Sequence, residues 1–325
     1  MTGRDKVTWR GYWVAAPTPF REDGALDLDA WAALLELYVR HGVHGVLVNG
    51  TTGEWFSQTP AERVQVATTA TEAVAGRIPV VVGVTSYTAA EAVTLGREAA
   101  RAGADGVAAT PPPYVHPTDD ETVAFYAALA GGCDLPLMVY NWPRGTAVDL
   151  SVDVLERLAH LDGVVAVKDS TGDELKALRG LERIGSEVRC FGRFIHRRGM
   201  AAIRELGGDG NIDGGGVGAP FAVPYYEALW AEDLDAARRW SRAYERLVEA
   251  LVLPDYGARF ASPTAQVKGV MRLLGQPGGH VRPPLLELAD PAALATIAER
   301  LTAVGLVEAL AARGEDPREG AAWAA

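Results

Sequence analysis

The chain has 325 residues, of which 48% are hydrophobic and 22% charged, and its formal net charge at pH 7 is −11. These values are ordinary for a globular protein with a large core, and they exclude a disordered or collagen-like chain. A chain with this net negative charge has no excess of basic residues to attract a negatively charged partner. We therefore expect neither nucleic acid nor an anionic membrane as a partner.

The sequence shows no signal for export or membrane insertion. The longest apolar runs, such as residues 78–84, have the length of a strand rather than of a membrane span, and residues 1–10 lack the apolar segment of a signal peptide. Cys133 and Cys190 lie far apart and outside any CxxC spacing, which is typical of free thiols in a reducing compartment. We therefore expect a cytoplasmic protein.

Short apolar runs alternate with longer amphipathic stretches from residue 11 onward, which is the pattern of βαβ units and a parallel sheet. The predicted strands are Gly11–Ala16, Val43–Asn49, Ile78–Val84, Gly106–Thr110, Leu135–Tyr140, Val164–Lys168, Val188–Gly192 and Gly210–Ile212. The third run is apolar at nearly every position, as expected for a strand covered on both faces. Eight such units predict a closed (β/α)8 barrel.

Three further helical patterns follow the eighth unit, namely Asp233–Leu253, Thr264–Leu274 and Pro291–Ala303. Because no Ser/Gly/Pro linker separates them from the barrel, we interpret them as a helical layer packed on it. The predicted division is a catalytic barrel over residues 11–231, a C-terminal layer over 232–310 and a loose tail over 311–325, where the sequence has no apolar face.

Functional side chains of a (β/α)8 barrel lie at the carboxyl ends of its strands. Lys168 directly follows the apolar run Val164–Val167. Burial of a lysine there lowers its pKa and supplies the neutral amine that attacks a ketone. The alternative is a structural lysine whose ammonium reaches solvent.

Two other strand ends carry groups suited to a small acid. Gly50, Thr51 and Thr52 offer hydroxyls and approachable N–H groups that suit a carboxylate, although a Gly/Thr turn is equally common as a plain connector. Tyr140 ends the fifth predicted strand, where its hydroxyl either relays a proton or belongs to a packed aromatic ring.

In combination, these residues resemble the dihydrodipicolinate synthase and N-acetylneuraminate lyase superfamily of class I aldolases. The resemblance covers the chain from the first predicted strand to the last predicted helix and rests on the segments Thr18–Phe20, Gly50–Glu54, Pro111–Pro117, Tyr140–Pro143, Val167–Asp173 and Arg282–Leu285. It implies a lyase that forms a Schiff base with pyruvate or a related 2-oxo acid, with an aldehyde as second substrate and without a cofactor.

The resemblance also implies roles for individual residues. Lys168 corresponds to the imine-forming lysine and Tyr140 to the tyrosine that moves protons. Thr51 and Thr52, with Gly50, correspond to the segment that binds the substrate carboxylate.

Two further positions match the superfamily. Tyr114 corresponds to a tyrosine that reaches across a dimer interface, and Ile212 to a branched residue near the lysine. The resemblance therefore implies a homodimer, or the homotetramer that is usual for the superfamily.

Two arginines depart from the superfamily pattern. Arg144 directly follows the Tyr-Asn-x-Pro segment, one position before the arginine of the lysine-pathway synthases, and Arg193 stands where neuraminate lyases carry acidic residues. We therefore expect Arg193, with Arg144 or His196, to recognise an acidic or otherwise unusual second substrate. The structural alternative is that Arg193 pairs with Asp213.

Other functions have to be weighed against an aldolase. A dehydratase or deaminating lyase of a sugar-acid- or hydroxyproline-derived 2-oxo acid would use the same imine. A catalytically silent protein of this fold would be expected to lack Lys168 or Tyr140, and both are present. A metal-dependent aldolase would need clustered ligands, whereas the six histidines show neither HxH nor HExxH spacing. We therefore expect no metal.

Overall fold

The computed structural model describes residues 2–253 and 256–324. Its strands form a closed barrel in the order of the chain, and successive strands are parallel. They are β1 (Gly11–Ala15), β2 (Gly45–Val48), β3 (Val80–Gly83), β4 (Gly106–Ala109), β5 (Leu137–Asn141), β6 (Val164–Asp169), β7 (Arg189–Phe191) and β8 (Gly208–Gly214). This closed order confirms the predicted (β/α)8 barrel.

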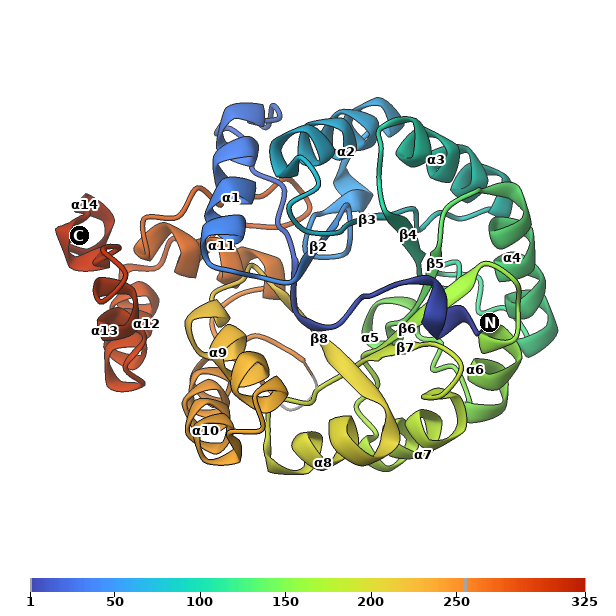
Figure 1. The fold of residues 1–325 in the computed structure, drawn as a ribbon. Coiled ribbons are helices and arrows are strands. Elements are labelled where there is room, and N and C mark those ends of the chain that lie inside the picture. Colours follow the sequence, from blue (N-terminus) through green and yellow to red (C-terminus); the bar gives the residue numbers. More distant parts are fainter. Residues whose placement is uncertain (1, 254–255, 325) are drawn as a thin grey trace.

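Helices form a ring around the barrel (Figure 1). They are α1 (Leu28–Arg40), α2 (Pro60–Val74), α3 (Ala89–Arg101), α4 (Asp119–Gly132), α6 (Val152–Ala159), α7 (Glu174–Ile184), α8 (Arg197–Leu206) and α9 (Ala219–Trp230), whereas the short α5 (Pro143–Thr146) lies inside the ring after β5. Single 3-10 turns occur at η1 (Gly3–Lys6) and η2 (Trp55–Ser57). The helices cover the outer face of every strand, which explains the continuous apolar runs.

Several helices begin at a polar side chain that closes the first turn. The Thr59 hydroxyl accepts a hydrogen bond from the Glu62 N–H at 3.2 Å, and the Thr59 N–H donates to the Glu62 carboxylate at 2.8 Å. Thr118 and Glu121 form the same reciprocal pair at the start of α4. Such capping boxes satisfy backbone donors that have no partner inside the helix.

The interior of the barrel is filled by side chains from all eight strands. The inner cluster consists of Trp9, Trp13, Ala15, Leu47, Val81, Ala108, Met138, Val165, Ala166, Phe191 and Ile212. At the amino ends of the strands, Arg4 and Arg189 bind the Asp209 carboxylate at 2.7 and 2.9 Å. This arrangement closes that end, so the opposite end is the accessible one.

The remaining helices lie against one side of the barrel (Figure 1). They are α10 (Leu234–Leu251), α11 (Pro263–Leu273), α12 (Pro291–Ala303), α13 (Leu306–Ala311), η3 (Pro317–Glu319) and α14 (Ala321–Ala324). The first three occur where the sequence predicts them. Beyond α13, Glu315 accepts at 2.6 Å from His41, which follows α1. The division of the chain into a barrel, a layer and a tail stays a prediction.

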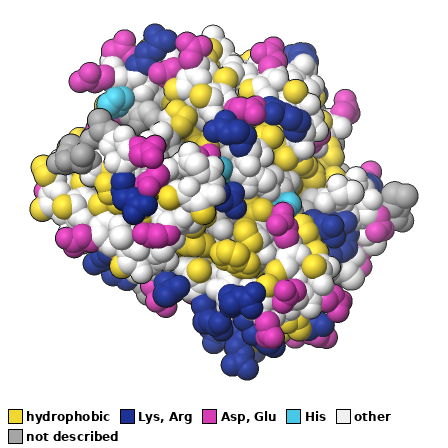
Figure 2. All heavy atoms as spheres, turned by 60° about the vertical axis from the view of Figure 1, so that its left-hand side comes forward, with side chains coloured by type: hydrophobic (Ala, Val, Ile, Leu, Met, Phe, Trp, Pro, Cys, Tyr) yellow, Lys and Arg dark blue, Asp and Glu magenta, His cyan; other side chains and the backbone are white. Residues whose placement is uncertain are grey.

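The surface is uneven in charge. Figure 2 looks at the side that carries the C-terminal elements, and its basic side chains gather at the lower edge. Along α10 the exposed arginines are Arg238, Arg239, Arg242 and Arg246. In the part of the chain that the structure describes, we find no helix that is both long and apolar enough to span a membrane.

Candidate active site

Lys168 lies in β6 at the open end of the barrel. It is paired in register with Tyr140 of β5, and its Nζ atom lies 3.7 Å from the centroid of the Tyr140 ring. The lysine is 6% exposed. Burial lowers the pKa of its ammonium from 10.5 to about 7, and the Asp213 carboxylate acts in the opposite direction. The structure therefore holds an amine in which the neutral form is abundant near neutral pH.

Tyr140 lies between the lysine and two hydroxyl groups. Burial raises the pKa of its own hydroxyl, and hydrogen bonds with Thr51 and Ser170 oppose that rise. Its ring stacks on Trp142, with centroids 6.1 Å apart. Because the hydroxyl is buried and hydrogen-bonded, it is held in one orientation for proton transfer. Sequence position and structure thus bring Lys168, Tyr140 and Thr51 together.

The loop over residues 50–54 is held by α11 and by the segment that follows it. Glu54 is fully buried and its carboxylate lies 2.6 Å from Nζ of Lys268 in α11. The same carboxylate accepts from the Arg282 N–H at 3.0 Å, and the Thr18 hydroxyl donates to the Gly53 carbonyl at 2.9 Å. A buried ion pair of this kind fixes geometry when its remaining hydrogen bonds are made. Two segments of the sequence resemblance, Thr18–Phe20 and Arg282–Leu285, therefore support the loop.

Thr52 and Ile212 lie on the β8 side of this end of the barrel. A side chain built on Gly214 would come within 3.3 Å of the Thr52 hydroxyl, so this glycine leaves room for the threonine. Ile212 is buried and belongs to the inner cluster with Ala166, the residue two before Lys168 in β6. Since side chains alternate along a strand, Ala166 and Lys168 both face the barrel interior.

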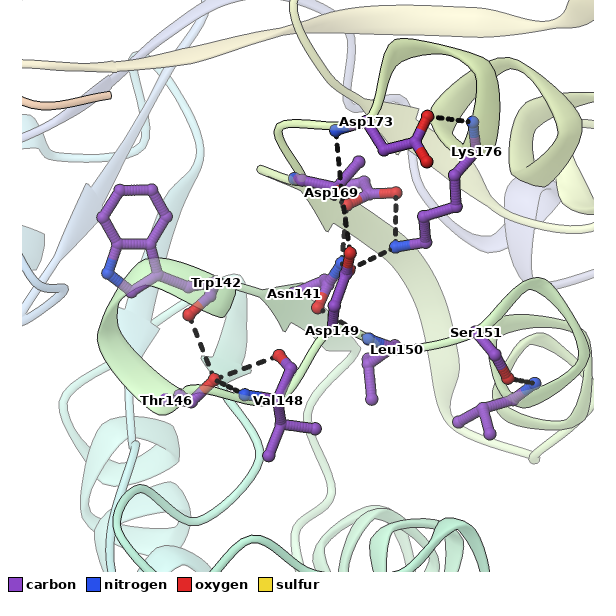
Figure 3. A network of polar contacts seen from close by, with 12 residues as sticks. Asn141, Trp142, Thr146, Val148, Asp149, Leu150, Ser151, Asp169, Asp173 and Lys176 are labelled. Carbon is purple, nitrogen blue, oxygen red and sulfur yellow. Dashed lines mark hydrogen bonds and ion pairs between the residues drawn. The ribbon is translucent and has the colours of Figure 1, made fainter. Parts of the chain in front are cut away.

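A polar network joins the ends of β5 and β6 (Figure 3). The Asn141 amide donates to Asp149 at 2.8 Å and to Asp169 at 2.7 Å, and the Lys176 ammonium donates to Asp149 at 2.6 Å. The Thr171 hydroxyl donates to the other Asp149 oxygen at 2.9 Å. Burial alone would raise the pKa of Asp149, but hydrogen bonds from Asn141, Lys176 and Thr171 together lower it. The network fixes the strand ends on which Tyr140 and Lys168 stand.

The two arginines expected to contact substrate lie at the rim. Arg144 is exposed on α5. Arg193 follows β7, and its guanidinium carbon lies 4.9 Å from the centroid of the Tyr256 ring. No direct ion pair joins Arg193 to Asp213 in the described parts of the chain, and Asp213 instead accepts from the Tyr244 hydroxyl. Burial raises the pKa of Asp213 and the positive charge of Arg193 acts against that rise, so the pairing of Arg193 with a carboxylate stays a prediction.

His196 has a structural position. Its Nδ1 accepts from the Gly199 N–H at 3.1 Å at the start of α8, and its Nε2 lies 2.7 Å from the Arg193 carbonyl oxygen. With the proton on Nε2, both ring nitrogens are hydrogen-bonded within the protein. His196 therefore positions the loop after β7.

Tyr256 is a rim residue that the sequence did not single out. Its ring packs edge-on against Trp142 with centroids 5.7 Å apart, and its hydroxyl donates to the Thr171 carbonyl at 3.3 Å. An aromatic wall thus runs from Tyr140 through Trp142 to Tyr256 and ends at Arg193. Nothing local in the sequence identifies Tyr256, because it lies between α10 and α11.

Tyr114 is exposed to solvent. It is 87% exposed and has a φ of +79°, in the loop after β4. Other exposed apolar side chains on neighbouring loops are Phe56, Tyr87 and Val115. Solvent exposure of such rings at several places on one end of the barrel is typical of a contact surface.

Metal ligands do not cluster in residues 2–253 and 256–324. No group of three or more histidine, cysteine, aspartate or glutamate side chains there is arranged to hold a metal ion. Catalysis without a metal stays a prediction.

A family model described as the dihydrodipicolinate synthetase family matches residues 8–302. The chain belongs to this family. It is 35% identical over 301 residues to a 4-hydroxy-tetrahydrodipicolinate synthase of Phenylobacterium zucineum, covering 92% of this chain and 98% of that one. It is 34% identical over 310 residues to an uncharacterised DapA-like lyase of Rhizobium meliloti, covering 91% and 96%.

Solved structures agree with this assignment. Dihydrodipicolinate synthase from Aquifex aeolicus has a TM-score of 0.82 at 29% identity and covers 92% of this chain and 99% of its own. YagE, a prophage protein of the same family from E. coli K12 solved in complex with pyruvate, has a TM-score of 0.82 at 25% identity, with 92% and 100% covered. The chain is therefore a lyase of the Schiff-base aldolase and synthase type, and the comparisons favour this reading over the dehydratase or deaminating alternative.

Proposed function

We propose that Lys168 forms a Schiff base with C2 of pyruvate or a related 2-oxo acid. The observation that carries this proposal is the burial of the lysine beside Tyr140, with a pKa near 7. The neutral amine attacks the ketone, and water leaves to give a protonated imine. That imine accepts the electron pair of the C3–H bond, so the resulting enamine adds to an aldehyde; cleavage is the reverse.

Tyr140 is the group that moves the protons of these steps. Its hydroxyl lies in a hydrogen-bonded chain with Thr51 and Ser170. The proton taken up when water leaves the carbinolamine passes through this hydroxyl. We assign the 2-oxo acid carboxylate to Thr51 and Thr52 with the Gly50 backbone, and the methyl side of the substrate to Ile212. The pyruvate complex of the relative YagE supports this substrate class.

The second substrate is assigned to the rim. Arg193 and Arg144 supply positive charge near the aromatic wall of Trp142 and Tyr256. That combination favours an aldehyde with an anionic or aromatic group over a polyol. Replacement of Arg193 by Ala is expected to raise KM for such a substrate and to leave pyruvate binding unchanged.

The working form is a homodimer or a homotetramer in the cytoplasm. The exposed rings of Tyr114, Tyr87 and Phe56 form the apolar surface that a second copy would cover, and Tyr114 then reaches the partner's site. Both cysteines are free and buried, which fits a reducing compartment. Light scattering that gives a monomer with full activity would contradict this part of the proposal.

Borohydride reduction in the presence of pyruvate tests the central step. Reduction converts the imine to a stable amine, so peptide mass spectrometry should place the adduct on Lys168. The variant Lys168→Met should give no adduct, whereas Lys176→Met, which removes a neighbouring lysine, should keep it. A panel of longer 2-oxo acids then separates pyruvate from its relatives. No adduct with any of them would refute the Schiff base.

A further inference from the structure

A cavity of about 400 Å³ lies outside the barrel, between its wall and two helices of the outer ring. Its inner side is formed by residues of β6 and β7, including Val167 and Cys190. Its outer side is formed by α7 and α8, which are neighbours in the ring (Figure 1). Its volume lies in the range of about 300–1,000 Å³ that small-molecule sites have.

The cavity exists because small residues face it from both helices. Ala177 and Gly180 stand on α7, and Gly199 and Ala202 stand on α8. Larger side chains at Ala177, Gly180 or Ala202 would fill the space between helix and strand, whereas a Cβ at Gly199 would collide with the Phe194 backbone. The other lining side chains of α7 are apolar and include Leu181 and Ile184. The interior therefore suits an apolar group.

The open end of the cavity carries unlike charges. Arg193 and Glu245 both line it, and neither forms an ion pair with any residue in the described ranges. By contrast, Arg198 binds Glu174 at 2.7 Å, and Asp169 accepts from the Asn141 amide. Arg193 hydrogen-bonds Tyr256, and Glu245 lies beside Arg242 and Arg246 of α10. One cation and one anion thus stand beside an apolar space without an ion pair of their own in the described ranges.

Glu245 lies at the same end of the barrel as Arg193. The preceding residue, Tyr244, donates a hydrogen bond from its hydroxyl to Asp213. Asp213 is the last residue but one of β8, so this contact lies at the carboxyl end of the strands. Arg193 follows β7 by two residues at that end. Both charges therefore face the entrance and not the closed end of the barrel.

The cavity is separate from the imine site. Along β6, Val167 and Asp169 line the cavity, whereas Lys168 between them does not. Because alternate side chains of a strand face opposite ways, the Lys168 ammonium points into the barrel and the cavity lies behind it. A ligand in the cavity is thus not the molecule bound to Lys168.

We propose that this cavity binds an apolar α-amino acid. Its carboxylate would pair with Arg193, its ammonium with Glu245, and its side chain would enter the space beside Gly180 and Ala202. Charge-assisted hydrogen bonds at a partly buried entrance orient the ligand, and the apolar interior supplies the affinity. Tyr256 lines both this entrance and the rim of the imine site.

Calorimetric titration of the full chain tests the proposal without reference to catalysis. L-Phenylalanine is the probe, compared with 3-phenylpropanoate, which lacks the ammonium, and phenethylamine, which lacks the carboxylate. We expect phenylalanine to bind at least tenfold more tightly than either. Equal affinity for phenylalanine and 3-phenylpropanoate would overturn the assigned ligand class, and no binding of phenylalanine would overturn the site.

A substitution that fills the cavity is the second test of the proposal. A Cβ added at Gly180 meets the Leu155 side chain at ordinary contact distance, and leucine favours the helix, so Gly180→Leu should fold and lose at least tenfold in phenylalanine affinity. The matched control is Gly131→Leu in α4, where an added Cβ meets nothing within 4 Å and binding should be unchanged. Undiminished binding by Gly180→Leu would place the ligand elsewhere and refute the proposal.

A last measurement joins the cavity to catalysis and rests on the proposed function. Because Arg193 is assigned to both ligands, phenylalanine should raise KM for an acidic second substrate and leave borohydride trapping of pyruvate at Lys168 unchanged. Calorimetric binding with an unchanged KM would overturn the shared use of Arg193. Failure of pyruvate trapping without phenylalanine would instead count against the proposed function alone.

Discussion

The reactivity of Lys168 should depend on pH as a buried amine does. With a pKa of about 7, about half of Lys168 is neutral at pH 7, whereas a lysine at 10.5 would be neutral in about one molecule in 3,000. Burial therefore raises the reactive fraction by about 1,500-fold. The variant Asp213→Asn removes a carboxylate that favours the ammonium, so it should move the midpoint to lower pH.

Pulse labelling with acetic anhydride, which modifies neutral amines, measures this midpoint. Peptide mass spectrometry then gives the labelled fraction of Lys168 at each pH, with Lys6, whose side chain is 39% exposed, as the reference in the same sample. We expect labelling of Lys168 to rise around pH 7. A midpoint near 10.5 in the wild-type protein, or an upward shift in Asp213→Asn, would refute the argument from burial.

Three other changes test the site and its support. Tyr140→Phe should lower turnover by about 10²–10⁴-fold, the usual loss of a general acid–base group, and should still give the pyruvate adduct; an unchanged rate would remove Tyr140 from proton transfer. Lys268→Met leaves Glu54 buried without its cation and should destabilise the protein by about 3–5 kcal/mol in urea unfolding, with partial recovery in the double variant Lys268→Met/Glu54→Gln; no loss would mean that the pair is dispensable. Hydrogen bonds from Arg282 lower the pKa of Glu62 from 4.5 to about 2, so its stabilising effect is complete above pH 4.5 and disappears as the pH falls through 2. Wild type and Glu62→Gln should therefore differ in thermal stability at pH 6 and converge on acidification, and a constant difference would contradict the coupling.

The site residues that could be predicted from the sequence are those whose position depends only on the strand that carries them. Lys168 and Tyr140 each follow an apolar run, and the barrel rule puts strand ends at one face. Thr51 follows β2 in the same way. For these residues, local pattern and global topology agree, so knowing the strand was enough to place the side chain.

The rest depends on contacts between distant segments. Glu54 follows β2 and Lys268 lies in α11, so no sequence spacing could predict that they pair. The surroundings of Arg193 could not be predicted for the same reason. Its suggested partner Asp213 accepts a hydrogen bond from Tyr244, which belongs to a helix beyond the barrel.

The Glu54–Lys268 pair also bears on synthesis of the chain. All eight strands have left the ribosome once Gly214 has emerged, yet the loop that carries Thr51 and Thr52 still lacks the cation that holds it. Arg282, which donates to the same carboxylate, emerges later still. A nascent barrel is therefore complete in its strands before its carboxylate-binding loop is fixed, and a chain that stops before α11 should be inactive even where the barrel has closed.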